Sequence, residues 1–290
     1  MLDKEEIIHL EEDVFRLIRD LVRDYCGIFF DDDSRYLLEK RLTRRVKNHH
    51  FGNFRDYYRY LLYDRKRDEE LASIMDVLTV NETYFFREQN QLKTFGEEIL
   101  PELKEKNRNK KRIRIWSAGC STGEEPYTLA MIMLEKGMFF GWNIEIFGSD
   151  INQRVLQVAR SGTYRKNSFR TIEPYYINKY FREYEEGTFR ISDSVKQYVN
   201  FSHLNLLDPY KTKLVGIMDV IFCRNVLIYF DRQSRKKVID LFHERITEGG
   251  YLLLGHAESL INISTAFTLK HFKHDMVYQK PLRKGAPIDA

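Results

Sequence analysis

The chain has 290 residues, 43% of them hydrophobic and 31% charged, which allows one large or two modest domains with a sizeable core. No stretch approaches the roughly 18 apolar residues that a membrane-spanning helix needs, and the acidic start lacks the apolar core of a signal peptide. The three cysteines are isolated, so neither a disulfide framework nor a metal site is predicted. We therefore expect a cytoplasmic protein without membrane insertion.

Apolar side chains recur at helical spacing in residues 1–80, which predicts an all-α domain without strands. The expected helices cover residues 5–25, 35–49, 54–63 and 69–78. The second helix is basic, because residues 34–47 hold six Lys or Arg against one acid, although the net charge of the whole chain is only +4.

Most of these basic side chains lie on one side of the second helix. At about 100° per residue, a broad arc away from the apolar line carries Lys40, Arg41, Arg44 and Lys47. Arg45 lies beside the apolar line and can snorkel. A solvated surface is the ordinary explanation, but the lack of acids at i±4 favours an acidic partner. The tyrosines Tyr57, Tyr58 and Tyr60 better fit core packing than base stacking, which favours an acidic protein over nucleic acid.

Residues 80–87, VNETYFFR, are expected to join the two halves of the chain. Asn81 and Thr83 are of capping or ligand-binding types, and Arg87 follows two aromatic residues. Arg87 is either an exposed arginine at a helix start or a bidentate partner for a carboxylate. A helix is expected at residues 89–104, and a basic linker continues to residue 111.

Residues 113–127, IRIWSAGCSTGEEPY, carry the main chemical signal. A strand at 112–117 runs into a small-residue loop, and Glu124 and Glu125 then open a helix. Small residues let a ligand approach the backbone, and a helix start offers unpaired N–H groups. The two acids would repel a phosphate, and the spacing matches neither common phosphate-binding motif. The loop therefore predicts a nucleoside ligand without phosphates, with S-adenosylmethionine (SAM) as the prime candidate.

Strands and helices alternate from residue 112 to about 280, which predicts a parallel α/β sheet. A small antiparallel unit is expected at about 175–200, a loop at 161–172, a tight turn at 248–250 and a frayed tail at 281–290. Asp150 ends the second strand, where an acid can bind ribose hydroxyls or cap the next helix. Ligands of such sheets bind at the carboxyl ends of strands, so the further candidates are Asn205 and Leu206 for adenine, and Asn225, Val226 and Tyr229.

Several stretches, in matching order, resemble the chemotaxis receptor methyltransferases, the CheR family. They are residues 81–87 (NETYFFR), 116–127 (WSAGCSTGEEPY), 149–151 (SDI), 222–231 (FCRNVLIYFD) and 255–260 (GHAESL), with the basic helix at 40–47 in the family position. The resemblance runs over roughly residues 10–280. It implies an all-α N-terminal domain joined to a class I SAM-dependent methyltransferase (Rossmann-like) domain with a small antiparallel β-subdomain.

The resemblance also implies a role for each matched residue. SAM would contact Asn81, Thr83, Arg87, Glu125, Asp150, Asn205, Leu206, Asn225 and Val226. Arg87 and Tyr229 would lie next to the acceptor carboxylate. The acidic methylation region of a receptor's helical bundle would lie against Lys40, Arg41, Arg44, Arg45 and Lys47. In the loop, Glu125 would face the amino group of SAM, and Glu124 keeps a capping role.

The implied reaction is methyl transfer to a glutamate side chain, giving a methyl ester and S-adenosyl-L-homocysteine (SAH). A carboxylate is already ionised at neutral pH, so no general base is needed. A role for His256 as a general base is therefore not expected. Family members that tether through a receptor pentapeptide carry a longer, glycine-rich turn than EEGT at 185–188. We therefore expect the tether-independent type of enzyme, and separately we expect a monomer. A nucleic-acid methyltransferase and a non-catalytic SAM-binding signalling module remain the alternatives.

Overall fold

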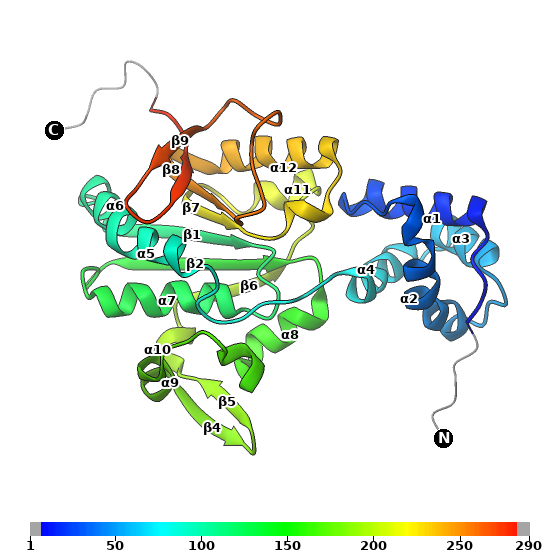
Figure 1. Ribbon diagram of the computed structural model, residues 1–290, viewed down its shortest axis with the longest axis horizontal. Helices are drawn as coiled ribbons and strands as arrows, with labels where there is room; N and C mark the ends of the chain where they lie inside the picture. The colour runs from blue at the N-terminus through cyan, green and yellow to red at the C-terminus, as the bar shows by residue number, and fades with distance from the viewer. Residues whose placement is uncertain (1–6, 283–290) are drawn as a thin grey trace.

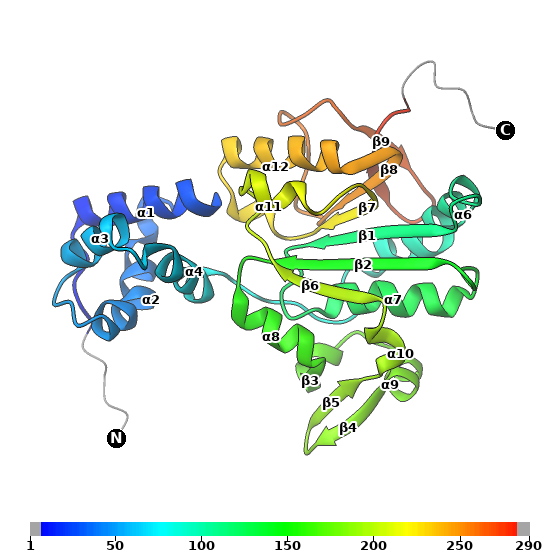
Figure 2. The same ribbon diagram turned by 180° about the vertical axis from the view of Figure 1, so that it is seen from behind.

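The computed structural model describes residues 7–282. Its N-terminal part is a bundle of helices set to one side of the central sheet (Figures 1 and 2). The helices are α1 Glu12–Cys26, α2 Arg35–Asn48, α3 Phe54–Tyr63 and α4 Arg67–Leu78, with a 3-10 turn, η1 Asp32–Ser34, before α2. The first helix begins at Glu12; of the earlier residues predicted to be helical, 5 and 6 lie outside the described residues and 7–11 are not helical. In this segment Leu10 N donates to the Glu39 carboxylate at 2.9 Å.

A seven-stranded sheet in the order β6-β2-β1-β7-β8-β10-β9 forms the centre of the second domain. Neighbouring strands from β6 to β8 are parallel, and β10 and β9 extend one edge in antiparallel pairs. The strands are β1 Arg112–Ala118, β2 Asn143–Asp150, β6 Val199–His203, β7 Met218–Cys223, β8 Ile246–Leu254, β9 Thr268–His271 and β10 Met276–Gln279. The predicted α/β sheet is confirmed.

Both faces of the middle of this sheet are buried, which explains why β7 and the end of β8 are nearly continuous apolar runs. Trp116 and Ile221 join the core shared with α12 and the N-terminal helices, whereas Ile115 and Val220 join the core formed with α7 and the connecting helix. The covering helices are α7 Glu124–Lys136, α8 Gln153–Ser161, α11 Pro209–Lys213 and α12 Arg232–Arg245. The connecting helix is continuous, from α5 Gln89–Thr94 through a π turn, η2 Phe95–Ile99, to α6 Leu100–Lys106.

A separate antiparallel sheet, in the order β3-β5-β4, projects from the α7 and α8 side of the molecule (Figures 1 and 2). This small subdomain contains β3 Thr163–Arg165, η3 Lys166–Phe169, α9 Pro174–Tyr180, β4 Phe181–Glu185, β5 Thr188–Ile191 and α10 Asp193–Lys196. It therefore begins before residue 175, inside the segment predicted as a loop. A strand of three residues is too short to show an alternating pattern, which explains the difference.

The predicted turn at residues 248–250 lies inside β8 instead. The pairing of β8 with β7 shifts register between Met218 and Val220, so the strand bulges at this point. A Cβ on Gly250 would lie 2.7 Å from the Asp219 carbonyl oxygen, and Gly249 has a φ of 66°. The two glycines therefore serve a bulge and a close strand approach rather than the predicted tight turn.

The two domains are joined by more than the linker. After α1, Ile28 forms a β-bridge with Phe230, which follows the 3-10 turn η4 Leu227–Tyr229. Phe29 N donates to Tyr229 O at 2.9 Å, and Asp231 N donates to Gly27 O at 3.3 Å. Within residues 7–282, no helix is both long and apolar enough to cross a membrane.

Candidate functional site

The predicted strand, loop and helix form as β1, residues 119–123 and α7. Gly119 and Gly123 have left-handed φ angles of 77° and 91°, which let the chain turn sharply from β1 into α7. A Cβ on Gly119 would lie only 2.4 Å from Cγ2 of Val226. Glycine therefore brings the loop after β1 against the loop after β7, and the two loops form one side of a cavity.

This cavity has a volume of about 310 Å³ and lies at the carboxyl edge of the sheet, facing the N-terminal helices. Its lining includes every residue predicted to bind the cofactor or the acceptor: Asn81, Thr83, Arg87, Glu125, Asp150, Asn205, Leu206, Asn225, Val226 and Tyr229. Phe29 and Leu37 complete the wall on the N-terminal side, and Arg41 is the member of the predicted basic set that reaches the cavity. Its size suits a small organic ligand.

Asp150 lies buried at the end of β2. Its two carboxylate oxygens accept hydrogen bonds of 2.8 Å from Ser121 N and Asn152 N. Burial raises the pKa of this carboxyl to about 6, although the backbone hydrogen bonds oppose the rise. The N-cap of α8 is Asn152, whose Oδ1 accepts from two backbone N–H groups. The alternative capping role of Asp150 is therefore not realised.

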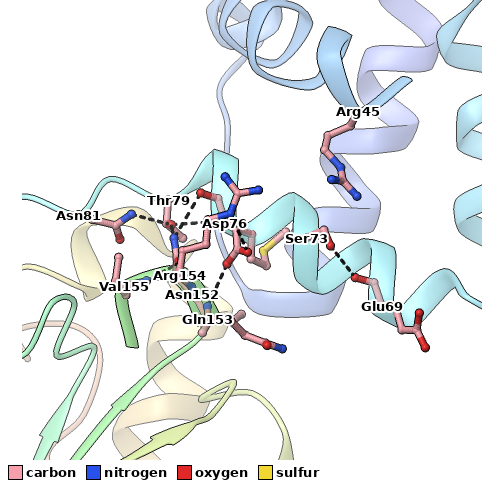
Figure 3. A network of polar contacts seen from close by, with 12 residues as sticks. Arg45, Glu69, Ser73, Asp76, Thr79, Asn81, Asn152, Gln153, Arg154 and Val155 are labelled. Atoms are coloured by element: carbon pink, nitrogen blue, oxygen red, sulfur yellow. Dashed lines mark hydrogen bonds and ion pairs between the residues drawn. The ribbon is translucent and has the colours of Figure 1, made fainter. Parts of the chain in front are cut away.

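Asn152 also ties α4 to this corner of the cavity (Figure 3). Its Nδ2 donates to Thr79 Oγ1 at 2.8 Å, and Asn81 donates to the same oxygen at 3.2 Å. Arg154 and Asp76 add an ion pair of 3.3 Å between α8 and α4. The same residue thus holds the end of the helical domain through its side-chain amide and Asp150 through its backbone N–H.

Glu125, the predicted partner of the SAM amino group, already has a partner within the protein. Its carboxylate lies 2.9 Å from Nε of Arg224 and accepts a 2.7 Å hydrogen bond from Ser117 Oγ. The Arg224 side chain is only 3% exposed. Nη2 of Arg224 donates to Arg87 O at 2.8 Å, so one arginine connects the helix start of α7 to the linker.

Glu124 does not cap α7, and the capping expectation for it is wrong. The N-cap is Gly123, and no side chain of the described residues caps this end. Glu124 is instead buried, where its carboxylate accepts from Thr122 Oγ1 at 2.6 Å and Ser168 Oγ at 2.9 Å. Burial raises its pKa, and the hydrogen bonds oppose that rise. Glu124 thus fastens the small subdomain to the loop after β1.

The loop after β7 is shaped by Glu258, which lies beyond β8. The Glu258 carboxylate accepts from the backbone N–H groups of Asn225, Val226, Ile228 and Gly255 at 2.7–3.3 Å. These bonds hold Asn225 at a left-handed φ of 59°. Asn225 Oδ1 is buried and has no hydrogen-bond partner within the described residues, so it is available to a donor on a ligand.

Asn205 lines the cavity and is also bonded within the protein. Its Nδ2 donates to Tyr25 O at 2.6 Å and its Oδ1 accepts from Leu207 N at 3.0 Å, so the amide joins the end of α1 to the loop after β6. Leu206 remains as an apolar part of the cavity wall.

The basic side chains predicted to form one face of α2 lie in different environments. Lys40 and Arg44 are exposed, whereas Arg41 donates to Leu78 O at 2.7 Å beside the cavity. Lys47 is half-buried. Arg45 turns inward and binds Glu70, whose side chain is only 3% exposed. Burial favours a higher Glu70 pKa, but hydrogen bonds from Arg45, Tyr57 and His49 outweigh it and leave the pKa lowered. Arg45 therefore has a structural partner.

Comparison with known proteins decides the family. The model for the CheR methyltransferase all-alpha domain matches residues 13–79, and the model for the CheR methyltransferase SAM binding domain matches residues 81–276. The chain belongs to the CheR family. A chemotaxis protein methyltransferase 2 from Vibrio cholerae is 40% identical over 282 residues, 95% of each chain. A chemotaxis protein methyltransferase from Borreliella burgdorferi is 35% identical over 257 residues, covering 86% of this chain and 89% of that protein.

This CheR family member is a SAM-dependent methyltransferase of chemotaxis. The cavity fits SAM, since it combines a close backbone approach at Gly119, a buried acid at Asp150 and the unpaired Oδ1 of Asn225. Within residues 7–282, no group of three or more His, Cys, Asp or Glu is placed to hold a metal ion.

Two residues that organise this CheR cavity were not predicted. Arg224 and Glu258 both lie in stretches that match the family, but nothing in the local sequence shows which distant groups they bind. His256, in contrast, lies outside the cavity lining, with its side chain 58% exposed and 3.6 Å from the Asp275 carboxylate.

Proposed function

We propose that the protein methylates glutamate side chains on the cytoplasmic helices of a chemoreceptor, giving glutamyl methyl esters. The proposal is carried by the guanidinium of Arg87, which lines the cavity and has no carboxylate partner among the described residues. The nearby acids are engaged elsewhere: Glu82 pairs with Arg170, and Glu125 pairs with Arg224. Arg87 is therefore available to an external carboxylate, and an arginine fork matches a carboxylate well.

The chemistry asks little of the protein beyond placement. When bound, SAM supplies a methyl group on a positively charged sulfur. An acceptor glutamate is already ionised at neutral pH, so no residue has to remove a proton. Arg87 and Tyr229 would hold the acceptor carboxylate in line with the methyl carbon. The contact with Arg87 must remain loose, because a tight ground-state ion pair would lower the reactivity of the acceptor.

The surface beside the cavity supports a helical, acidic substrate. Arg41 reaches the cavity from α2, and the exposed Lys40 and Arg44 continue the positive charge along the same helix. An acidic receptor helix lying along α2 would bring its glutamates toward Arg87. We do not include Arg45 in this surface, because its guanidinium binds Glu70.

We further propose that binding needs no receptor pentapeptide tether and that the enzyme acts as a monomer. β4 and β5 are joined by the short segment Glu186–Gly187, which offers no extended glycine-rich loop for a peptide. A single chain supplies all the predicted cavity residues. A substrate on cytoplasmic receptor helices would require the enzyme in the same compartment.

The decisive assay is transfer of labelled methyl from SAM to purified receptor cytoplasmic fragments with and without the C-terminal pentapeptide. We expect base-labile label, released as methanol, at equal rates on both fragments, and loss of most activity in Arg87→Ala. Base-stable label on RNA would indicate a nucleic-acid methyltransferase. SAH binding without any transfer would indicate a signalling module. A rate that depends on the pentapeptide would contradict tether independence alone.

A further inference from the structure

The linker segment that carries Arg87 is held by the small subdomain. Phe85 N donates to Ser168 O at 2.9 Å, and Thr171 Oγ1 donates to Phe85 O at 2.7 Å. The buried Phe85 ring packs against Phe169 and Phe181, with ring centroids 5.5 and 5.0 Å apart. The small subdomain, which projects from the α7 and α8 side of the molecule in Figure 1, therefore also supports the linker.

Arg170 extends this support to the groups that Arg87 itself contacts. Its guanidinium lies 2.7 Å from the Glu82 carboxylate and 3.7 Å from the centroid of the Tyr84 ring. Arg87 uses the same two residues: its Nη1 donates to Glu82 O at 2.9 Å, and its guanidinium lies 5.6 Å from the Tyr84 centroid. Two arginines therefore share one glutamate and one tyrosine.

The charge arrangement gives Arg170 a specific consequence. Both members of the Arg170–Glu82 pair are partly exposed, so the pair contributes little to stability. Without Arg170, the Glu82 carboxylate would lose its cationic partner. The backbone carbonyl of Glu82 already accepts a hydrogen bond from Arg87. The guanidinium of Arg87 would then be at hand to replace that cation, and an internal ion pair there would compete with the ligand carboxylate.

We propose that Arg170 is a positioning residue for methyl transfer: it binds the Glu82 carboxylate and the Tyr84 ring, and so keeps the guanidinium of Arg87 free to face the cavity. The inference rests on the proposed role of Arg87. It assigns to the small subdomain a part in the reaction that does not depend on any receptor tether.

The test compares Arg170→Ala with Arg170→Ala/Glu82→Gln, using SAH affinity from calorimetry together with kcat and KM for a receptor fragment. The single variant should lose about tenfold in SAH affinity and kcat, and the double variant should regain all but about threefold, because the neutral amide no longer competes for Arg87. The melting temperature should change little in either variant. A merely structural role would give no such rescue.

Arg190→Ala is the matched control, since Arg190 lies in the same small sheet and stacks 3.5 Å from the Tyr184 ring, without touching the linker contacts of Arg87. The SAH affinity and kcat of Arg190→Ala should stay within about twofold of the wild-type values. Failure of Glu82→Gln to rescue Arg170→Ala, or an equal loss in Arg190→Ala, would overturn the inference while leaving Arg87 in place. Wild-type activity and SAH affinity in Arg87→Ala would instead overturn the proposed role of Arg87, and the inference with it.

Discussion

Replacing Asp150 by asparagine should remove a pH dependence from cofactor binding. Burial sets the pKa of Asp150 at about 6, against an ordinary value of 3.8. If the ionised carboxylate accepts hydrogen bonds from the ribose hydroxyls, the affinity for SAH should fall about tenfold for each pH unit below 6. An asparagine amide cannot titrate in this range, so Asp150→Asn should bind SAH with little change between pH 5 and 8.

The contribution of Asp150 to stability should depend on pH in the opposite direction from SAH affinity. The native pKa lies above the unfolded value, so the native state binds more protons between about pH 4 and pH 6. The stability from this group is complete below about pH 4 and is lost as the pH rises through 6. The difference between pKa values of 6 and 3.8 corresponds to about 3 kcal/mol.

The asparagine variant should still be folded at neutral pH. It avoids the cost of about 3 kcal/mol for burying an ionised carboxylate. It also turns an amide NH₂ toward one of the two backbone donors, Ser121 N or Asn152 N, which costs about 1–3 kcal/mol. The two effects nearly cancel, so a change in SAH affinity can be assigned to the site.

The assay is calorimetric titration with SAH from pH 5 to 8, with thermal melts at each pH. Asp76→Asn is the control, because the Asp76 charge adds to the raised pKa of Asp150. In Asp76→Asn, SAH affinity should fall with the same slope per pH unit, but the fall should begin at a lower pH. A flat wild-type profile, or an equal slope in Asp150→Asn, would refute the role given to Asp150.

Three further predictions concern single residues. His256→Ala should keep most methyl-transfer activity, since His256 lies outside the cavity lining; a folded variant that binds SAH but is inactive would contradict this. Gly119→Ala should lose most SAH affinity, because its Cβ would lie 2.4 Å from Val226, and Val226→Ala in the same chain should restore part of it. Arg45→Ala should lower the free energy of unfolding by about 3 kcal/mol, because it leaves buried Glu70 without its arginine. In denaturant melts, exposed Arg44→Ala should cost less than about 0.5 kcal/mol, and equal losses would be evidence against the buried pair.

The spacing of apolar residues predicted the helices and strands well wherever a segment was long enough to show a helical or alternating pattern. The helix at Phe54–Tyr63 has its predicted bounds, and the strand predicted at 112–117 ends one residue later, at Ala118. The bulge at Gly249 and Gly250 could not be predicted, because paired glycines also mark turns and only the register of β8 against β7 separates the two cases.

Side-chain partners were harder to predict than positions. The predicted cavity residues do line one cavity, since the carboxyl ends of parallel strands meet at one edge. The Glu125–Arg224 pair and the four bonds of Glu258 join residues far apart in the chain, and no spacing rule covers such contacts. Arg45 shows the same limit, because helical geometry placed it beside the apolar face but could not supply Glu70 from another helix.

The bridge between Ile28 and Phe230 limits how members of this family could exchange parts. Residues 27–30 belong to the N-terminal domain in sequence, yet residues 27–29 bond to residues 229–231 and residues 28–30 line the cavity. In a chimera joined at residue 80, the N-terminal helical domain of one protein would therefore form part of the cavity wall of another. Receptor preference and cofactor affinity should change together in such chimeras, unless the strip at 229–231 is transplanted with the bundle.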